Sequence, residues 1–169
     1  MATTRLPDFC MENALKVPGV TMPEYKQAGS TLNVSSYSFD AAGTEGIQFH
    51  VPYLPAYGSG NLTFTVRWYG DSATTGDVVW GGAVAAITPN TDSQDAETKA
   101  FATETTATDS HLGTTAQRIH EVDITVSNLD SIATGDEVWF RVQRLGGNGS
   151  DTMSGDAQMT ALVVSYSDT

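Results

Sequence analysis

The sequence predicts an all-β domain, an eight-stranded antiparallel jelly-roll-like β-sandwich with an extended N-terminal arm. Thr, Ser, aromatic and β-branched residues are plentiful, whereas Lys, Glu and Leu, which favour helices, are sparse. From residue 30 onward, short β-like runs alternate with turn-forming clusters such as residues 57–60, 134–136 and 146–150. Strands are therefore expected at residues 31–39, 46–51, 61–69, 77–88, 98–108, 118–127, 137–144 and 158–167.

Alternation within three of these runs predicts the core. Apolar residues recur there at every second position, as expected for strands with one buried face. The side chains expected in the core are Leu62, Phe64, Val66, Trp68, Val122, Ile124, Val126, Val138, Phe140 and Val142. No repeat of fixed period is present, which argues against a propeller or a β-helix. The strand order stays open between a jelly roll and another Greek-key sandwich.

The first 28 residues differ from the rest of the chain. Prolines and a glycine interrupt scattered apolar residues, and no period of 2 or 3.6 is sustained. We interpret residues 1–28 as an extended arm and residues 29–169 as the β-sandwich domain. A disordered tail would lack so many large apolar side chains, so the arm is expected to order against its own domain or a neighbour. The arm residues expected to bind a partner are Leu6, Phe9, Leu15, Val17 and Val20.

Charge and composition exclude several classes of partner. The net charge is −12, so the long-range field repels phosphate backbones and anionic lipid, and we expect no nucleic-acid or membrane partner. Cys10 is the single cysteine, which rules out an intrachain disulfide and a zinc site of cysteine pairs. The sequence contains neither a signal-peptide-like start nor an apolar run of transmembrane length, which predicts synthesis in a cytoplasm.

No residue pattern marks catalysis or metal binding. His50, His111 and His120 lie far apart in sequence and lack metal-ligand spacing. His120 alternates with apolar neighbours, so we interpret it as a partly buried histidine that is hydrogen-bonded to the backbone. No Gly-x-Ser-x-Gly nucleophile elbow occurs, and the aspartates occupy turn positions that favour Asp anyway. We therefore expect no enzyme activity, no catalytic residue, no cofactor and no metal.

The glycine-rich segment 146–151 has two interpretations. Its carbonyls, with Asn148 and Asp151, offer oxygen ligands for Ca²⁺, but the alternating acidic ligands of a dedicated site are missing, which favours a purely structural loop. Arg144 precedes this segment, and Asp151 and Asp156 lie at and beyond its end. We expect Arg144 to pair with one of the two aspartates and to clamp the loop.

Trp139 is the candidate for an exposed aromatic side chain. It alternates with Phe140, so it is expected to face away from the core, toward solvent or a subunit, with Arg141 on the same side. A single outward tryptophan is more typical of a protein interface than of a sugar groove, which usually needs several aligned rings. Trp139 and Arg141 are therefore the interface candidates.

Four strand-and-turn segments follow one another in a characteristic order. They are residues 61–69 (NLTFTVRWY), 72–80 (SATTGDVVW), 132–144 (IATGDEVWFRVQR) and 150–157 (SDTMSGDA), followed by a closing strand. In this order they resemble a group of small virion structural proteins of tailed bacteriophages, over roughly residues 30–167. No functional residue carries over, because no catalytic set is known for this group.

The resemblance implies a jelly-roll-like domain on the virion, commonly a homotrimer. As a capsid decoration (cement) protein, the chain would bridge major capsid proteins on the capsid surface, with the arm buried against capsid or neighbouring subunits. The alternative is a tail-fibre or head-fibre component that binds host surface glycan or protein. The lack of heptads and repeats argues against a fibre shaft. A glycan-cleaving enzyme is the third and weakest hypothesis.

Overall fold

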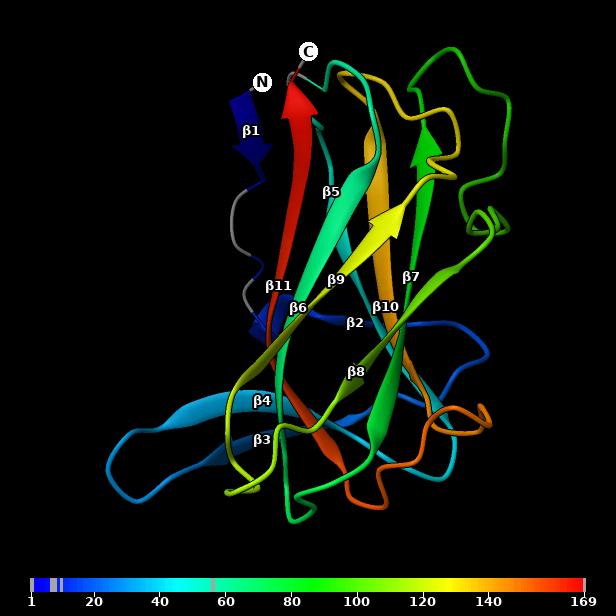
Figure 1. Cartoon of the computed structure of the whole chain (residues 1–169). Helices are drawn as coiled ribbons and strands as arrows, with labels where there is room; N and C mark the ends of the chain where they lie inside the picture. The colour runs from blue at the N-terminus through cyan, green and yellow to red at the C-terminus, as the bar shows by residue number, and fades with distance from the viewer. Residues whose placement is uncertain (1, 7–8, 10, 56, 169) are drawn as a thin grey trace.

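The computed structural model is an all-β sandwich of two antiparallel sheets, and it describes the whole chain except residues 1, 7–8, 10, 56 and 169. One sheet has the order β3-β4-β11-β6-β9, with β1 also pairing with β11, and the other has the order β2-β5-β10-β7-β8. In Figure 1, β11, β6 and β9 lie in front of β5, β10 and β7, and both chain termini lie at one end of the sandwich. The predicted all-β sandwich class is confirmed.

The described residues form eleven strands and one short 3₁₀ turn, η1 (Met11–Asn13). The strands are β1 (Ala2–Arg5), β2 (Leu15–Lys16), β3 (Glu24–Ala28), β4 (Val34–Phe39), β5 (Thr44–Val51), β6 (Leu62–Gly70), β7 (Asp77–Ile87), β8 (Thr105–Ser110), β9 (His120–Val126), β10 (Glu137–Leu145) and β11 (Ala157–Asp168). The eight runs expected from the sequence correspond to β4 through β11. None of the described helical residues forms a segment long and apolar enough to cross a membrane.

The described part of the N-terminal segment orders against its own domain, one of the two alternatives that the sequence left open, and it does so by forming strands. Its described residues add three strands: β1 pairs with β11, β2 with β5 and β3 with β4. Beyond β1, the Leu6 N–H donates to the Val164 carbonyl at 2.9 Å. Pro18 and Pro23 lie between β2 and β3, and proline cannot donate to a strand ladder. These strands are therefore only two to five residues long, too short for an alternation pattern to be visible.

Strand β8 begins much later than expected. The run predicted at residues 98–108 becomes regular only at Thr105, where β8 starts to pair with β7. Upstream, Asp95 closes a turn by accepting a backbone hydrogen bond from Glu97, and Ala102 makes a backbone hydrogen bond to Val84. Residues 96–104 therefore stay irregular beside β7, where they can cover part of the sheet.

The core lies between the two sheets, and the residues predicted for it are found there. All of them are buried except Val122, which is half-buried and packs against the core. The edge of Trp80 meets Phe39, with their ring centroids 5.1 Å apart. Gly82 points inward on β7, where an added Cβ would lie 2.9 Å from the Phe64 ring. This glycine therefore lets the two sheets approach closely.

Candidate functional site

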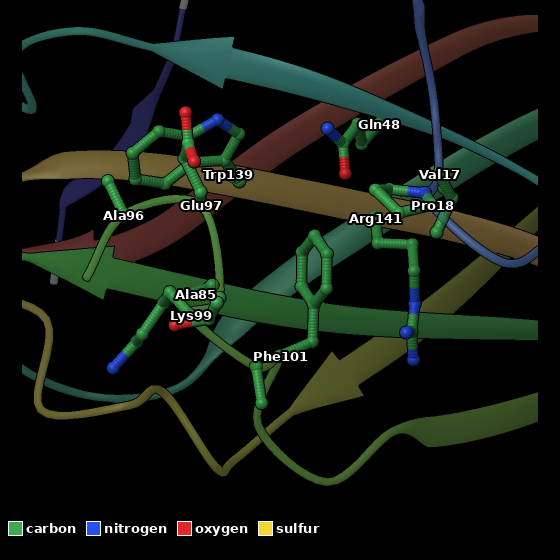
Figure 2. Close-up of a pocket in the computed structure, with 12 residues that line it drawn as sticks. Val17, Pro18, Gln48, Ala85, Ala96, Glu97, Lys99, Phe101, Trp139 and Arg141 are labelled. Carbon is green, nitrogen blue, oxygen red and sulfur yellow. The ribbon is translucent and has the colours of Figure 1, made fainter. Parts of the chain in front are cut away.

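A cavity of about 340 Å³ opens on the outer face of the five-stranded sheet. Its floor comes from β5, β7 and β10, one wall from the irregular segment after β7, and one end from residues 17–18 after β2 (Figure 2). The residues that line it are Val17, Pro18, Gln48, Ala85, Ala96, Glu97, Thr98, Lys99, Ala100, Phe101, Trp139 and Arg141. This cavity contains both interface candidates, Trp139 and Arg141.

The register of β7 and β10 explains the hollow. Trp139 pairs with Ala85, and Arg141 pairs with Ala83, so large outward side chains on β10 stand beside small ones on β7. Next along β7, Gly81 also faces outward, and the Glu104 carboxyl group lies over it, where an added Cβ would meet the carboxyl carbon at 2.5 Å. The row of small residues on β7 beside the large ones on β10 leaves a groove. The segment 96–101 forms one wall of this groove.

Trp139 forms one side of this cavity. Its indole is half-buried and stacks on the His50 ring, with the centroids 4.7 Å apart and the planes 15° apart. Trp68 and Trp80, by contrast, are fully buried in the core. Trp139 therefore faces outward, as the alternation pattern predicts, and it is the tryptophan that is available to a partner.

Arg141 lies farther along the same face and is paired with a carboxylate. Its Nη2 donates to Glu104 Oε2 at 3.2 Å, and its guanidinium lies 4.8 Å from the centroid of the Phe101 ring. Burial raises the pKa of the Glu104 carboxyl, and the neighbouring Arg141 opposes that rise. The Nε of Arg141 is buried and has no hydrogen-bond partner within the described part of the chain.

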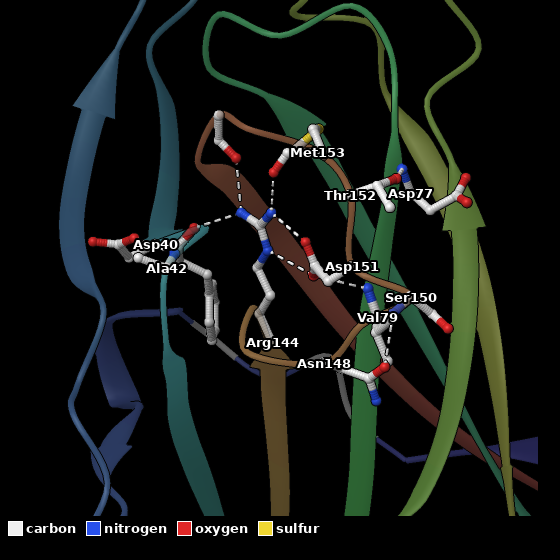
Figure 3. A network of polar contacts seen from close by, with 12 residues as sticks. Asp40, Ala42, Asp77, Val79, Arg144, Asn148, Ser150, Asp151, Thr152 and Met153 are labelled. Carbon is white, nitrogen blue, oxygen red and sulfur yellow. Dashed lines mark hydrogen bonds and ion pairs between the residues drawn. The ribbon is translucent and has the colours of Figure 1, made fainter.

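Arg144, three residues later on the same strand, points into the protein and forms the loop clamp (Figure 3). Its Nε and Nη2 donate to the two carboxylate oxygens of Asp151 at 3.0 and 2.8 Å, and neither side chain is more than 1 % exposed. The remaining guanidinium N–H groups donate to the carbonyls of Phe39, Gly155 and Met153 at 2.8 to 3.0 Å. The guanidinium thus joins β4 to the β10–β11 loop.

Of the two aspartates that the sequence offered, the structure pairs Arg144 with Asp151. Asp151 also accepts a hydrogen bond from the backbone N–H of Val79 at 3.0 Å, while Asp156 instead accepts one from the Ser38 hydroxyl at 3.0 Å.

The possible calcium ligands of the loop also make contacts within the fold. The side chain of Asn148 accepts a hydrogen bond from the backbone N–H of Ser150. The side-chain oxygens of Asp151 and Asn148 thus make hydrogen bonds within the fold, and within the described residues no group of three His, Cys, Asp or Glu is placed to hold a metal.

The structure gives the five arm residues different environments. Leu6 and Val17 are buried at 2 % exposure each, and Phe9 packs against the rings of Phe49 and Phe140. Val20 is half-buried, and Leu15 is 47 % exposed. Leu6, Phe9 and Val17 thus pack against their own domain rather than reaching toward a neighbour.

Two histidines meet near the β8–β9 loop, a contact that the sequence did not reveal. The ring centroids of His111 and His120 are 4.5 Å apart, and His120 stacks on Trp68. His111 Nδ1 accepts from the Gly113 N–H at 3.0 Å, and its Nε2 lies 3.1 Å from the Ala116 carbonyl. His120 is buried, and neither of its ring nitrogens has a hydrogen-bond partner among the described residues. The backbone bonds expected for His120 therefore belong to His111.

The comparisons with known proteins identify the fold of this chain but not its family. No family model and no curated protein matches this chain. Among solved structures, it is similar to a carbohydrate-binding module specific for non-crystalline cellulose, with a TM-score of 0.52 and 12 % identity over 89 % of this chain and 86 % of that one. This likeness shows a jelly-roll-type β-sandwich.

A second similar structure is the family 11 carbohydrate-binding module from Clostridium thermocellum in complex with a β-1,3-1,4-mixed-linked tetrasaccharide. Its TM-score is 0.49, with 10 % identity over 96 % of this chain and 94 % of that one. At these identities, neither neighbour identifies a ligand for this chain.

Proposed function

We propose that this chain is a non-catalytic virion structural protein of a tailed bacteriophage, a capsid decoration protein that binds the major capsid protein on the capsid surface. The proposal rests on the positions, in the structure, of the four segments that resemble phage virion proteins. Residues 61–69 fall in β6, 72–80 lead into β7, 132–144 lead into and through β10, and 150–157 form the Arg144-clamped loop before β11. The segments therefore build the central framework, which supports a shared architectural role.

The proposed attachment differs from the one expected from the sequence, because arm residues are part of the core. The β3–β4 hairpin is the better candidate for the contact with the capsid. β4 pairs with β11 only over Tyr37–Phe39, so the outer half of the hairpin is held by its own two strands, and it reaches past the body of the sandwich in Figure 1. Leu32 at its tip is 76 % exposed. A short hairpin with an exposed apolar tip gains stability when it docks on another surface.

Capsid binding by hairpin variants tests this proposal. We expect Leu32→Asp to abolish co-sedimentation with capsids that lack the protein, while the matched variant Leu112→Asp, at a second exposed leucine in the β8–β9 loop, leaves it intact. Equal binding by both variants and the wild type would count against the hairpin contact. Deleting residues 1–28 does not test this contact alone, since it removes Leu6 and Met11 from the core and strand β3 from the hairpin.

Assembly is part of the same proposal. We expect the domain to form a homotrimer on the virion. Threefold symmetry repeats each weak contact three times, and the repeated contacts together give firm attachment. Sedimentation-velocity analysis of the purified chain measures the oligomer directly, and a strictly monomeric chain both in solution and on capsids would exclude the trimer.

The second candidate function is host recognition by a fibre-associated protein that binds surface glycan or protein. The cavity beside Trp139 favours this candidate, because it offers an outward aromatic side chain and polar groups in one hollow. Both candidate functions need the same rigid sandwich. Locating the chain on the capsid or on a fibre distinguishes between them.

A further inference from the structure

We infer that the cavity on the outer face of the five-stranded sheet is a binding site for a neutral sugar, which stacks on Trp139 and is hydrogen-bonded by Gln48, Glu97 and Arg141. This inference rests on the second candidate function, since it names a ligand class for that site. The capsid-binding tests do not depend on it.

The shape of the cavity suits a small flat ligand. Its volume of about 340 Å³ lies at the lower end of the range of about 300–1,000 Å³ that is typical of ligand sites. Trp139 and Phe101 supply aromatic surface on two sides, and Ala85 keeps the floor between them low (Figure 2). Aromatic rings bind the apolar faces of sugar rings while leaving the sugar hydroxyls free at the edge.

The charges around the cavity select against an anionic ligand. Arg141 and Lys99 line it, but each is paired with a carboxylate, Arg141 with Glu104 at 3.2 Å and Lys99 with Asp130 at 2.8 Å. The carboxylate of Glu97 and the net charge of −12 therefore oppose an anionic ligand. A neutral ligand avoids this penalty.

Hydrogen-bonding capacity is available at the cavity wall. In the described part of the chain, neither the Gln48 amide nor the Glu97 carboxylate makes a side-chain hydrogen bond, and the Nε–H of Arg141 is buried without a partner. An amide, a carboxylate and a guanidinium together provide donors and acceptors, as hydroxyl groups require. The side chain of Arg141 is 18 % exposed, so the exposed part of its guanidinium can donate to a ligand hydroxyl.

Tryptophan fluorescence gives a direct readout, because Trp68 and Trp80 are fully buried and only Trp139 contacts the cavity. The purified chain is titrated with neutral mono- and disaccharides of glucose, galactose, xylose and N-acetylglucosamine, with glucuronate and galacturonate, and with choline as a cationic probe. We expect saturable fluorescence changes with at least one neutral sugar and weaker binding of the uronates and choline.

Variants assign the signal to the site. Trp139→Ala is expected to lower affinity, measured by calorimetry, about tenfold or more. Gln48→Ala is expected to lower it less, and Tyr53→Ala, at an exposed aromatic outside the cavity, to leave it unchanged. Thermal unfolding of each variant shows whether it is folded, and Gln48→Ala still tests the site if Trp139→Ala is not. No binding of any neutral sugar, unchanged affinity in Trp139→Ala and Gln48→Ala, or a preference for uronate or choline would each overturn the inference.

Discussion

Arg141 and Arg144 lie on the same strand, three residues apart, and they occupy opposite regions of the molecule. Arg144 points inward, is fully buried, and makes five hydrogen bonds to Asp151 and to three carbonyl groups. Arg141 points outward, is 18 % exposed at its side chain, and makes one ion pair and one aromatic contact. The sequence predicted an outward interface position for Arg141 and a loop clamp for Arg144. The opposite directions of the two side chains explain this difference.

The difference separates a structural cation from an available one. A buried guanidinium is tolerated only when its donors are satisfied, and Arg144 meets that condition by tying strand β4 and the β10–β11 loop together. Arg141 lines a cavity, and 18 % of its side chain stays exposed. The fully hydrogen-bonded Arg144 is therefore part of the framework, whereas Arg141 can still donate to a ligand in the cavity.

The largest effect is expected from breaking the clamp. Arg144→Met leaves the Asp151 carboxylate buried without its partner, which should lower the free energy of unfolding by about 3–5 kcal/mol. Urea denaturation followed by circular dichroism measures the change. The matched control is Arg67→Met, which breaks an ion pair with Glu121 whose side chains are about half exposed, and which should cost less than about 1 kcal/mol. Equal losses in both variants would contradict the structural role of the clamp.

A smaller effect is expected at the cavity. Arg141→Met removes the ion pair with Glu104 and the contact with Phe101 but keeps most of the aliphatic packing. Since both charged groups are partly solvated, unfolding free energy should fall by about 1 kcal/mol. The same denaturation experiment applies. A loss as large as that of Arg144→Met would mean that the outward arginine is also part of the framework, and the contrast between the two regions would fail.

The smallest effect is a pH dependence from His120, a buried imidazole whose ring nitrogens have no hydrogen-bond partner in the part of the chain that the structure describes. Burial, and next the neighbouring His111, lowers the pKa of His120 below 6.5, while Asp109 acts in the opposite direction and Arg118 in the same one. The unfolded chain therefore binds a proton more readily than the folded one, so the contribution to stability is complete above pH 6.5 and is lost as the pH falls below it.

Comparing the wild type with His120→Phe isolates this contribution. Unfolding free energies measured at pH 7.5 and pH 5.5 should differ less in the variant than in the wild type, because the carboxylates titrate alike in both. Phe is expected to keep the stacking on Trp68. An identical pH dependence in the two proteins would show that His120 takes up no proton on unfolding.

Much of the fold was predictable because alternation is a local signal. The core positions on β6, β9 and β10 follow from it, as does the outward direction of Trp139 and Arg141. The three N-terminal strands were missed because prolines keep them too short for a period to appear.

The parts of the site that were not predicted depend on contacts between distant residues. The choice of Asp151 over Asp156 depends on how the β10–β11 loop folds back, and residue types alone do not decide it. The cavity wall comes from the segment 96–101, whose irregular path beside β7 has no sequence pattern. His111 and His120 are nine residues apart and meet only because the β8–β9 loop closes between them.

The central proposal is that this chain decorates a phage capsid, and cryo-electron microscopy of mature particles from the source that encodes the chain tests it most directly. A decoration protein predicts density for this sandwich on the outer surface of the capsid, at threefold or quasi-threefold positions, with the β3–β4 hairpin against the shell. Density confined to the tail or its fibres, or a mature particle without this chain, would contradict the proposal.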